Sequence, residues 1–136
     1  AADPHLQDGG GTWTAITSRS TREVADALVL SNAVRRAVIG LVKTASRELA
    51  PAVRANALLP GAHETARIRE LIEDDIERGV YADYEAGYAD WVAEVPLDRM
   101  GDPRELGDVV AFLSSERAGY VNGAALAVDG GSLRSV

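Results

Sequence analysis

The sequence has no cysteine, and Lys43 is the only lysine among its 14 basic residues. The absence of cysteine excludes disulfide bonds and thiolate metal sites. The two histidines, His5 and His63, have no further histidine or acidic residues at a spacing typical of metal ligands. The sequence therefore predicts a domain with neither a disulfide nor a metal centre.

Long apolar runs are also missing, because charged residues interrupt every segment that could span a membrane. No basic-then-apolar leader opens the chain, so we expect a cytoplasmic protein. The formal net charge of −7 argues against nucleic acid as a partner, since phosphates would be repelled. Excess acid with one lysine fits a high-salt cytoplasm, and it fits a GC-rich genome equally well.

Methionine occurs once, as Met100, and the first residue is Ala1. This start predicts a piece of a longer protein or a processed product. The length of 136 residues suffices for one small domain with a modest core. Without an internal repeat or a low-complexity linker, residues 1–136 are predicted to form one domain or part of one.

Hydrophobic periodicity predicts strands that alternate with helices. Short β-prone runs occupy residues 12–17, 53–59 and 124–128. Helical patterns cover residues 27–49 and 65–93, the second with a hinge near Gly79, and a third helix is expected after Asp102. Strands separated by helices pair in parallel through right-handed crossovers. The predicted fold class is therefore α/β.

Two of these helices carry strong local signals. Asp102, Pro103 and Glu105 have the spacing of an N-cap, a first helical position and a capping box. In the long helix, apolar residues recur at steps of three or four and predict one stripe: Leu30, Val34, Val38, Leu41, Ala45 and Leu49.

Four stretches together resemble one protein family. They are ITS at residues 16–18, AVIGLVK at 37–43, VRANALLPG at 53–61, and GYVNG at 119–123 leading to VDGG at 128–131. Each is weak alone, but in this order they are similar to the short-chain dehydrogenase/reductase family, close to its 3-oxoacyl-carrier-protein-reductase-like members. The resemblance runs from about Gly10 to the end of the chain.

The resemblance implies the C-terminal half of a Rossmann-type doubly wound parallel sheet, with three strands and flanking helices, equivalent to strands five to seven of the family. It also implies NAD or NADP as cofactor, a small-molecule carbonyl or alcohol substrate, and a homo-oligomer. The glycine-rich pyrophosphate turn of the family does not occur here. Gly9-Gly10-Gly11 does not replace it, because it precedes a strand and does not open a helix.

The catalytic positions of the family are only partly preserved. Ser18 matches the family serine, which orients a substrate carbonyl, although a serine at this point could also simply cap its own turn. Ser31 stands at the tyrosine position and Arg35 at the lysine position. A phenol has a pKa of about 10, whereas an aliphatic hydroxyl is a much weaker acid, so Ser31 is a poor proton donor.

Three interpretations of this substitution remain open. In the first, the parent protein is an oxidoreductase with an altered site, and Arg35 still holds ribose hydroxyls although it cannot relay a proton. In the second, the scaffold has become a non-catalytic binding or regulatory protein. In the third, the chain is an inactive truncated product with an exposed strand edge, and it is marginally stable, dimeric or aggregation-prone.

The segment from Pro60 to Thr65 matches the family loop that contacts the nicotinamide. By resemblance, Pro60, Gly61, His63 and Thr65 are cofactor-binding residues. Thr65 can also cap the following helix, and both roles are compatible. His63 replaces an apolar residue of the family, and it either supplies the lost acid or is merely solvated or hydrogen-bonded.

Residues 65–93 would then be the lid-like helices that cover the substrate. Four aromatic residues fall on one predicted helical face: Tyr81, Tyr84, Tyr88 and Trp91. Such a stripe serves either packing or a pocket.

Overall fold

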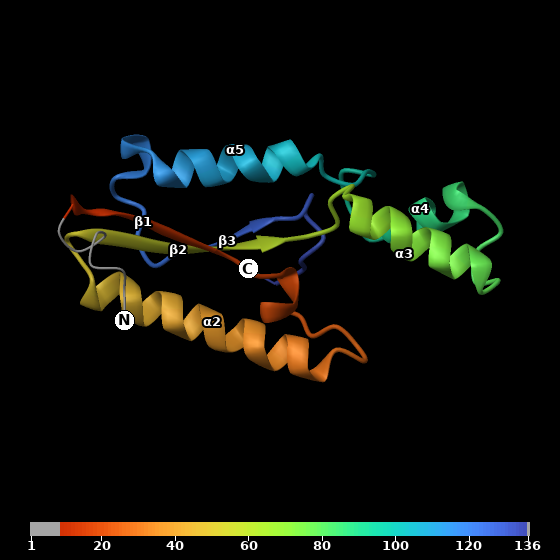
Figure 1. Cartoon of the computed structure of the whole chain (residues 1–136), viewed down its shortest axis with the longest axis horizontal. Helices are drawn as coiled ribbons and strands as arrows, with labels where there is room; N and C mark the ends of the chain where they lie inside the picture. The colour runs from red at the N-terminus through yellow and green to blue at the C-terminus, as the bar shows by residue number, and fades with distance from the viewer. Residues whose placement is uncertain (1–8, 136) are drawn as a thin grey trace.

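The computed structural model describes residues 9–135 and contains one parallel sheet of three strands (Figure 1). The strands β1 (Gly11–Ile16), β2 (Val53–Pro60) and β3 (Ala125–Val128) lie in the order β1-β2-β3. Gly11 pairs with Val53 at one end of the β1–β2 ladder, and Ile16 pairs with Leu58 at the other. The predicted α/β class, strand positions and parallel pairing are confirmed.

Helices cover both faces of this sheet. The long helix α2 (Val29–Glu48) lies on one face and α5 (Pro103–Ser114) on the other (Figure 1). Short 3₁₀ turns, η1 (Arg19–Thr21) and η2 (Glu116–Ala118), follow β1 and α5. None of the helices built from residues 9–135 has the length and apolar character needed to cross a membrane.

A separate pair of helices extends from the end of β2. α3 (Ala66–Glu77) and α4 (Tyr84–Val92) pack on each other beyond the three layers (Figure 1). Between them Gly79 has a φ of 76°, a left-handed conformation that glycine adopts at little cost, and this confirms the predicted hinge. Ile72, Val92 and Met100 form the core of this pair.

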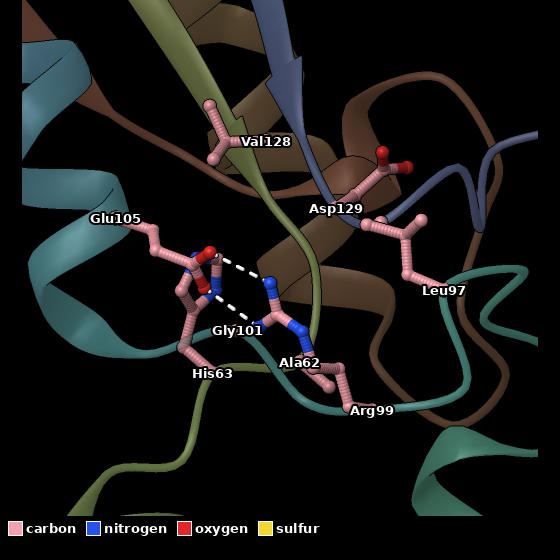
Figure 2. A pocket seen from close by; sticks show the side chains of 9 residues that line it. Ala62, His63, Leu97, Arg99, Gly101, Glu105, Val128 and Asp129 are labelled. Atoms are coloured by element: carbon pink, nitrogen blue, oxygen red, sulfur yellow. Dashed lines mark hydrogen bonds and ion pairs between the residues drawn. The ribbon is translucent and has the colours of Figure 1, made fainter.

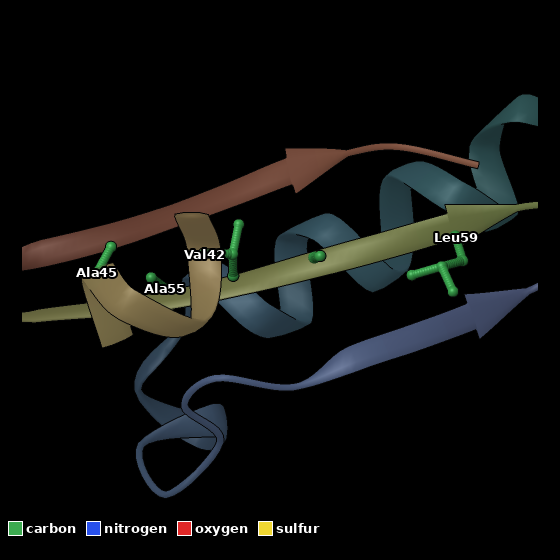
Figure 3. Packing of buried hydrophobic residues seen from close by; sticks show 5 residues of the cluster. Val42, Ala45, Ala55 and Leu59 are labelled. Atoms are coloured by element: carbon green, nitrogen blue, oxygen red, sulfur yellow. The ribbon is translucent and has the colours of Figure 1, made fainter. Parts of the chain in front are cut away.

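The central strand β2 is buried along most of its length, and its side chains alternate between the two faces. Ala55, Ala57 and Leu59 pack against Val42 and Ala45 of α2 (Figure 3). On the opposite face, Leu58 packs against Leu113 of α5 and Ala118 of η2.

That opposite face also carries two polar residues of β2, and both are bonded. The guanidinium of Arg54 donates to the carbonyls of Leu113 and Ser115 at the end of α5, at 2.8 and 3.0 Å. Asn56, which is 1% exposed, donates to the carbonyl of Val121 and accepts from the N–H of Ala124, both at 3.0 Å. These bonds hold the end of α5 and the segment before β3 against the central strand.

The predicted apolar stripe of α2 divides into two parts. Ala45 is buried, and Val38 and Leu49 pack against the same cluster. Leu30, Val34 and Leu41 are 80, 62 and 56% exposed. The sheet covers only the face of α2 centred on Val42, so the adjoining apolar flank meets no partner within residues 9–135.

Candidate active site

The carboxyl ends of the parallel strands bring two predicted segments together. Ser18 follows β1, and Pro60 is the last residue of β2. Both line a pocket of about 350 Å³, whose wall also includes Gly61 and, from the helical pair, Ile68 and Trp91. Ligands of open α/β sheets bind at this edge. The pocket is therefore the candidate active site.

Ser18 begins the 3₁₀ turn η1. Its Oγ accepts a 3.1 Å hydrogen bond from the N–H of Ser20, and its carbonyl accepts one of 2.9 Å from Oγ1 of Thr21. The capping role considered for this serine is therefore confirmed. A hydroxyl has one proton to donate in addition to its acceptor sites, so Ser18 can still donate to a carbonyl oxygen in the pocket.

Ser31 and Arg35 are brought together, but behind the pocket rather than in its wall. Nε of Arg35 donates a 3.0 Å hydrogen bond to Oγ of Ser31, and Nη1 donates to the carbonyl of Thr17. Neither residue lines the pocket that contains Ser18. Arg35 thus ties α2 to the end of β1, immediately before Ser18.

The loop after β2 is packed tightly against the end of β3. The N–H of Gly61 donates to the carbonyl of Val128 at 3.0 Å. A Cβ on Gly61 would lie 2.7 Å from Cβ and 2.8 Å from Cα of Asp129, so only glycine fits here. Thr65 caps α3, since its side chain accepts from the N–H of Ile68 at 3.4 Å. The N-cap interpretation of Thr65 is confirmed.

His63 is buried, with 6% of its surface exposed, and lies in a different cavity from Ser18. Its Nδ1 is 3.1 Å from the carbonyl oxygen of Gly61, and its ring packs against Gly101. The cavity, of about 130 Å³, also contains Arg99 and Glu105 (Figure 2). The structure does not bring His63 together with Ser18.

Arg99 and Glu105 form a bidentate ion pair beside His63, with N–O distances of 2.8 and 2.7 Å (Figure 2). The hydrogen bonds from Arg99, followed by one from the N–H of Asp102, lower the pKa of Glu105 to about 2. Asp102 and Glu105 complete the predicted capping box of α5. The sequence predicted the cap formed by Asp102 and Glu105. It did not predict that Arg99 of the preceding loop binds Glu105.

The aromatic stripe of the lid-like helices divides between packing and pocket. Tyr84 and Tyr88 pack at a centroid distance of 6.5 Å, and Oη of Tyr88 accepts from the N–H of Met100 at 3.2 Å. Tyr81 lies between α3 and α4 and not on a helix, so its expected place on the helical face was wrong, and its Oη donates to Asp90 at 2.7 Å. Trp91 is the member of the stripe that lines the pocket with Ser18.

The sequence did not reveal a clamp that ties the carboxyl-terminal segment to Glu23 and to Glu94 of the pocket wall. Glu23, which follows η1, accepts hydrogen bonds from the N–H groups of Arg134 and Ser135 at 2.9 and 2.8 Å. Arg134 in turn pairs with Glu94, just after α4, at 3.4 Å. No local pattern predicts contacts between residues more than a hundred positions apart.

Over the residues that the structure describes, no group of three or more histidine or acidic side chains is arranged to hold a metal ion. His5 lies outside the described residues.

A parallel sheet with helices on both faces and a serine and a Pro-Gly loop at its carboxyl edge defines a Rossmann-type α/β protein. Residues 1–132 match the family described as enoyl-(acyl carrier protein) reductase. The chain belongs to the short-chain dehydrogenase/reductase family, among its 3-oxoacyl-carrier-protein-reductase-like members.

Individual relatives agree with this assignment. The chain is 40% identical to (3R)-3-hydroxyacyl-CoA dehydrogenase of Mus musculus over 69% of this chain and 32% of that protein. Aldohexose dehydrogenase of Thermoplasma acidophilum superposes with a TM-score of 0.84 at 30% identity, over 95% of this chain and 51% of that one.

A third relative has a catalytic site that is itself described as unusual. It is a short chain oxidoreductase of Pseudomonas aeruginosa PAO1, solved with NADPH and described as containing an atypical catalytic center. Its TM-score is 0.83 at 27% identity, over 98% of this chain and 50% of that one. The chain thus spans about a third of the first of these relatives and about half of the other two.

Proposed function

We propose that the chain is the nicotinamide- and substrate-facing part of an NAD- or NADP-dependent oxidoreductase, which transfers hydride between the cofactor and a carbonyl or alcohol carbon. The observation that carries the proposal is the pocket in which Ser18 and the Pro60-Gly61 loop meet the wall formed by α3 and α4. The family relationship supports the same reaction class.

The residues of the loop suit the nicotinamide end of such a cofactor. Gly61 lets the loop pack directly against Asp129 at the carboxyl edge of the sheet, and Thr65 presents an exposed hydroxyl at the start of α3. Arg35 uses its Nε and one Nη in protein contacts, so its remaining donors are available for ribose hydroxyls. His63 would contribute through the backbone of the loop, because its ring lies in the neighbouring cavity. The bound cofactor would supply the hydride.

Within this proposal, Ser18 orients the substrate oxygen and stabilises charge that grows on it. Ser31 is not its proton donor, because an aliphatic hydroxyl is a much weaker acid than a phenol and Ser31 lies outside the pocket wall. The proton would then come from solvent through the open side of the pocket. We therefore expect turnover well below that of an enzyme with the family's tyrosine and lysine.

The test is to restore that pair in the full-length protein with the double substitution Ser31→Tyr and Arg35→Lys. Oxidation of NADH or NADPH would be followed with a panel of ketones. A positioned general acid contributes about 10²–10⁴-fold, so the double variant should gain a rate of that order. Arg35→Lys alone is the control, since it adds no acid and should gain little. A wild type that already matches the double variant would show that the proton does not pass through these positions.

The second candidate is a non-catalytic binding or regulatory protein on the same scaffold. It is favoured by the mutual hydrogen bond of Arg35 and Ser31, which uses these side chains to hold α2 against β1. In that case the full-length protein would bind NADH or NADPH, seen as enhanced nicotinamide fluorescence, and would reduce no ketone of the panel. Measurable turnover by the wild type would exclude this candidate.

We also propose that the protein is cytoplasmic and self-associates. The exposed apolar flank of α2 with Leu30, Val34 and Leu41 supports self-association, because contiguous apolar surface on helices is commonly covered by a partner. Light scattering coupled to size exclusion would show a dimer or a larger species of the 136-residue chain. A monodisperse monomer with a sharp cooperative melt would contradict this part of the proposal.

A further inference from the structure

The pocket beside Ser18 is small and its wall is mainly apolar. Its volume of about 350 Å³ lies at the lower end of the roughly 300–1,000 Å³ that is usual for small-molecule sites. Leu28, Ile68, Trp91 and Val95 supply its large apolar side chains. The part of a ligand that fills the pocket formed by residues 9–135 must therefore be compact and mostly hydrocarbon.

Most polar side chains of this wall already have partners in the protein. Oγ of Ser132 donates to Asp129 at 3.1 Å, and the carboxylate of Glu94 accepts from Arg134 at 3.4 Å. Ser18 keeps one free proton after it caps η1. Glu23, close by, is occupied by the backbone N–H groups of the carboxyl-terminal segment.

Arg19 is the exception. It follows Ser18 directly, lies in the pocket wall and is only half-exposed, yet within residues 9–135 its guanidinium makes no hydrogen bond or ion pair. A partly buried guanidinium is stabilised by a carboxylate, which its planar fork can bind with two parallel hydrogen bonds. Arg19 thus has no acidic side chain in direct contact, although it lies close enough to Glu23 for their charges to interact and shares the pocket wall with Glu94.

We propose that this pocket takes a compact apolar oxo or hydroxy acid, with Arg19 as the specificity-determining residue that binds the carboxylate. Ser18 would hold the neighbouring carbonyl or hydroxyl oxygen, and the apolar chain would lie against Leu28 and Trp91. This inference rests on the proposed function, because it names the substrate class of the same site. Sugars fit poorly, since the wall has few free hydrogen-bonding groups for several hydroxyls.

The direct test is binding to the 136-residue chain without cofactor. Ketoisocaproate and its neutral amide would be titrated by calorimetry, with Trp91 fluorescence as a second signal. The wild type should bind the acid about tenfold more tightly than the amide, or better, because a hydrogen bond to a charged group is worth more than a neutral one. The preference should weaken at high salt.

Variants assign the preference to one side chain. Arg19→Met should bind both ligands about equally, and Arg19→Lys should keep part of the preference and so report on the charge if the methionine variant is unstable. Arg117→Met is the matched control, because this exposed arginine lies in η2, beside the amino-terminal part of β2 and far from the pocket. Arg117→Met should bind like the wild type.

Two results would overturn the inference: a wild type that binds neither ligand or both equally, and an Arg19→Met variant that keeps the preference. The proposed oxidoreductase activity has a separate readout in the full-length protein. If the acid binds through Arg19 but no nicotinamide cofactor binds or turns over, the proposed function fails and the carboxylate site stands. If ketones are reduced but the acid shows no preference, only the inference about Arg19 fails.

Discussion

Arg35 and Ser31, one helical turn apart in α2, are joined by a 3.0 Å hydrogen bond from Nε to Oγ. The sequence predicts that they stand at the family's lysine and tyrosine positions, and in this structure Arg35 donates to Ser31. Arg35 also reaches the carbonyl of Thr17 at the end of β1. The pair therefore holds the helix against the strand that carries Ser18.

This contact predicts that Arg35 contributes to stability. Arg35→Met removes the hydrogen bond that the charged guanidinium donates to the carbonyl of Thr17. A hydrogen bond from a charged group contributes about 1.5–3 kcal/mol to the free energy of unfolding. Urea unfolding should show a loss of that size. Arg36→Met is the matched control, since Arg36 is exposed and makes one long bond to Arg22, and a change within about 0.5 kcal/mol is expected. Equal losses in both variants would refute the tethering role.

The close approach of Gly61 to Asp129 gives a second prediction. Gly61→Ala places a methyl group 2.8 Å from Cα of Asp129, and overpacking of this kind costs about 1–3 kcal/mol. Gly107→Ala in α5 is the control, because that position faces open space and alanine favours helix by up to about 1 kcal/mol. Thermal melts should move in opposite directions. A neutral Gly61→Ala would mean that the loop can shift away from β3.

The Arg99–Glu105 pair predicts a specific pH dependence. The pKa of Glu105 is lowered in the folded protein to about 2, from an ordinary value of 4.5, so its contribution is complete above about pH 5 and is lost as the pH falls through that interval. Glu105→Gln keeps a side-chain acceptor for the capping box but has no charge. The difference in unfolding free energy between wild type and Glu105→Gln should therefore shrink between about pH 4.5 and 2.

Arg99→Met provides the check on cause, because Arg99 is the largest contributor to the lowered pKa of Glu105. In the Arg99→Met background, the difference in unfolding free energy caused by Glu105→Gln should change less with pH. A wild-type difference that stays constant from pH 7 to pH 3 would show that the ion pair does not persist in solution.

Asn56 makes two hydrogen bonds from β2 to the segment before β3, whereas Asn122 in that segment makes one to β2 and one to α2. Asn56 is 1% exposed, whereas Asn122 is exposed and bonds the N–H of Ala55 and the carbonyl of Ser46. A buried group left unsatisfied costs about 1–3 kcal/mol, so Asn56→Ala should be clearly destabilising in urea. Asn122→Ala should also be destabilising, because its partners Ala55 and Ser46 are 0 and 5% exposed and would lose a buried bond each. A neutral Asn56→Ala would contradict this explanation.

Much of the fold could be predicted because its signals are local. The capping box of Asp102 and Glu105 and the glycine at the hinge each depend on a few consecutive residues, and the structure has both. The parallel order of the strands followed from the helices between them. The stripe of α2 was predicted as a single apolar face, but periodicity does not show how far the sheet extends over it.

The site was predictable only in part, for the same reason. The register placed Ser18 and the Pro60 loop at the carboxyl edge of the sheet, and the pocket contains both. The ring of His63 packs against Gly101, and Glu23 accepts hydrogen bonds from the carboxyl-terminal segment. These contacts join residues far apart in the chain, so no spacing predicts them.

The sequence by itself determined where the strands and helices lie, because caps, turns and hydrophobic period act over a few residues. It also led to the prediction that Ser31 and Arg35 stand at the family's tyrosine and lysine positions. Only the tertiary structure decided that Arg35 binds Ser31 and Thr17, that His63 lies apart from Ser18, and that Arg19 shares the pocket with Trp91. The physical reason is that side-chain partners are chosen by non-local packing, which exists only after the chain has folded.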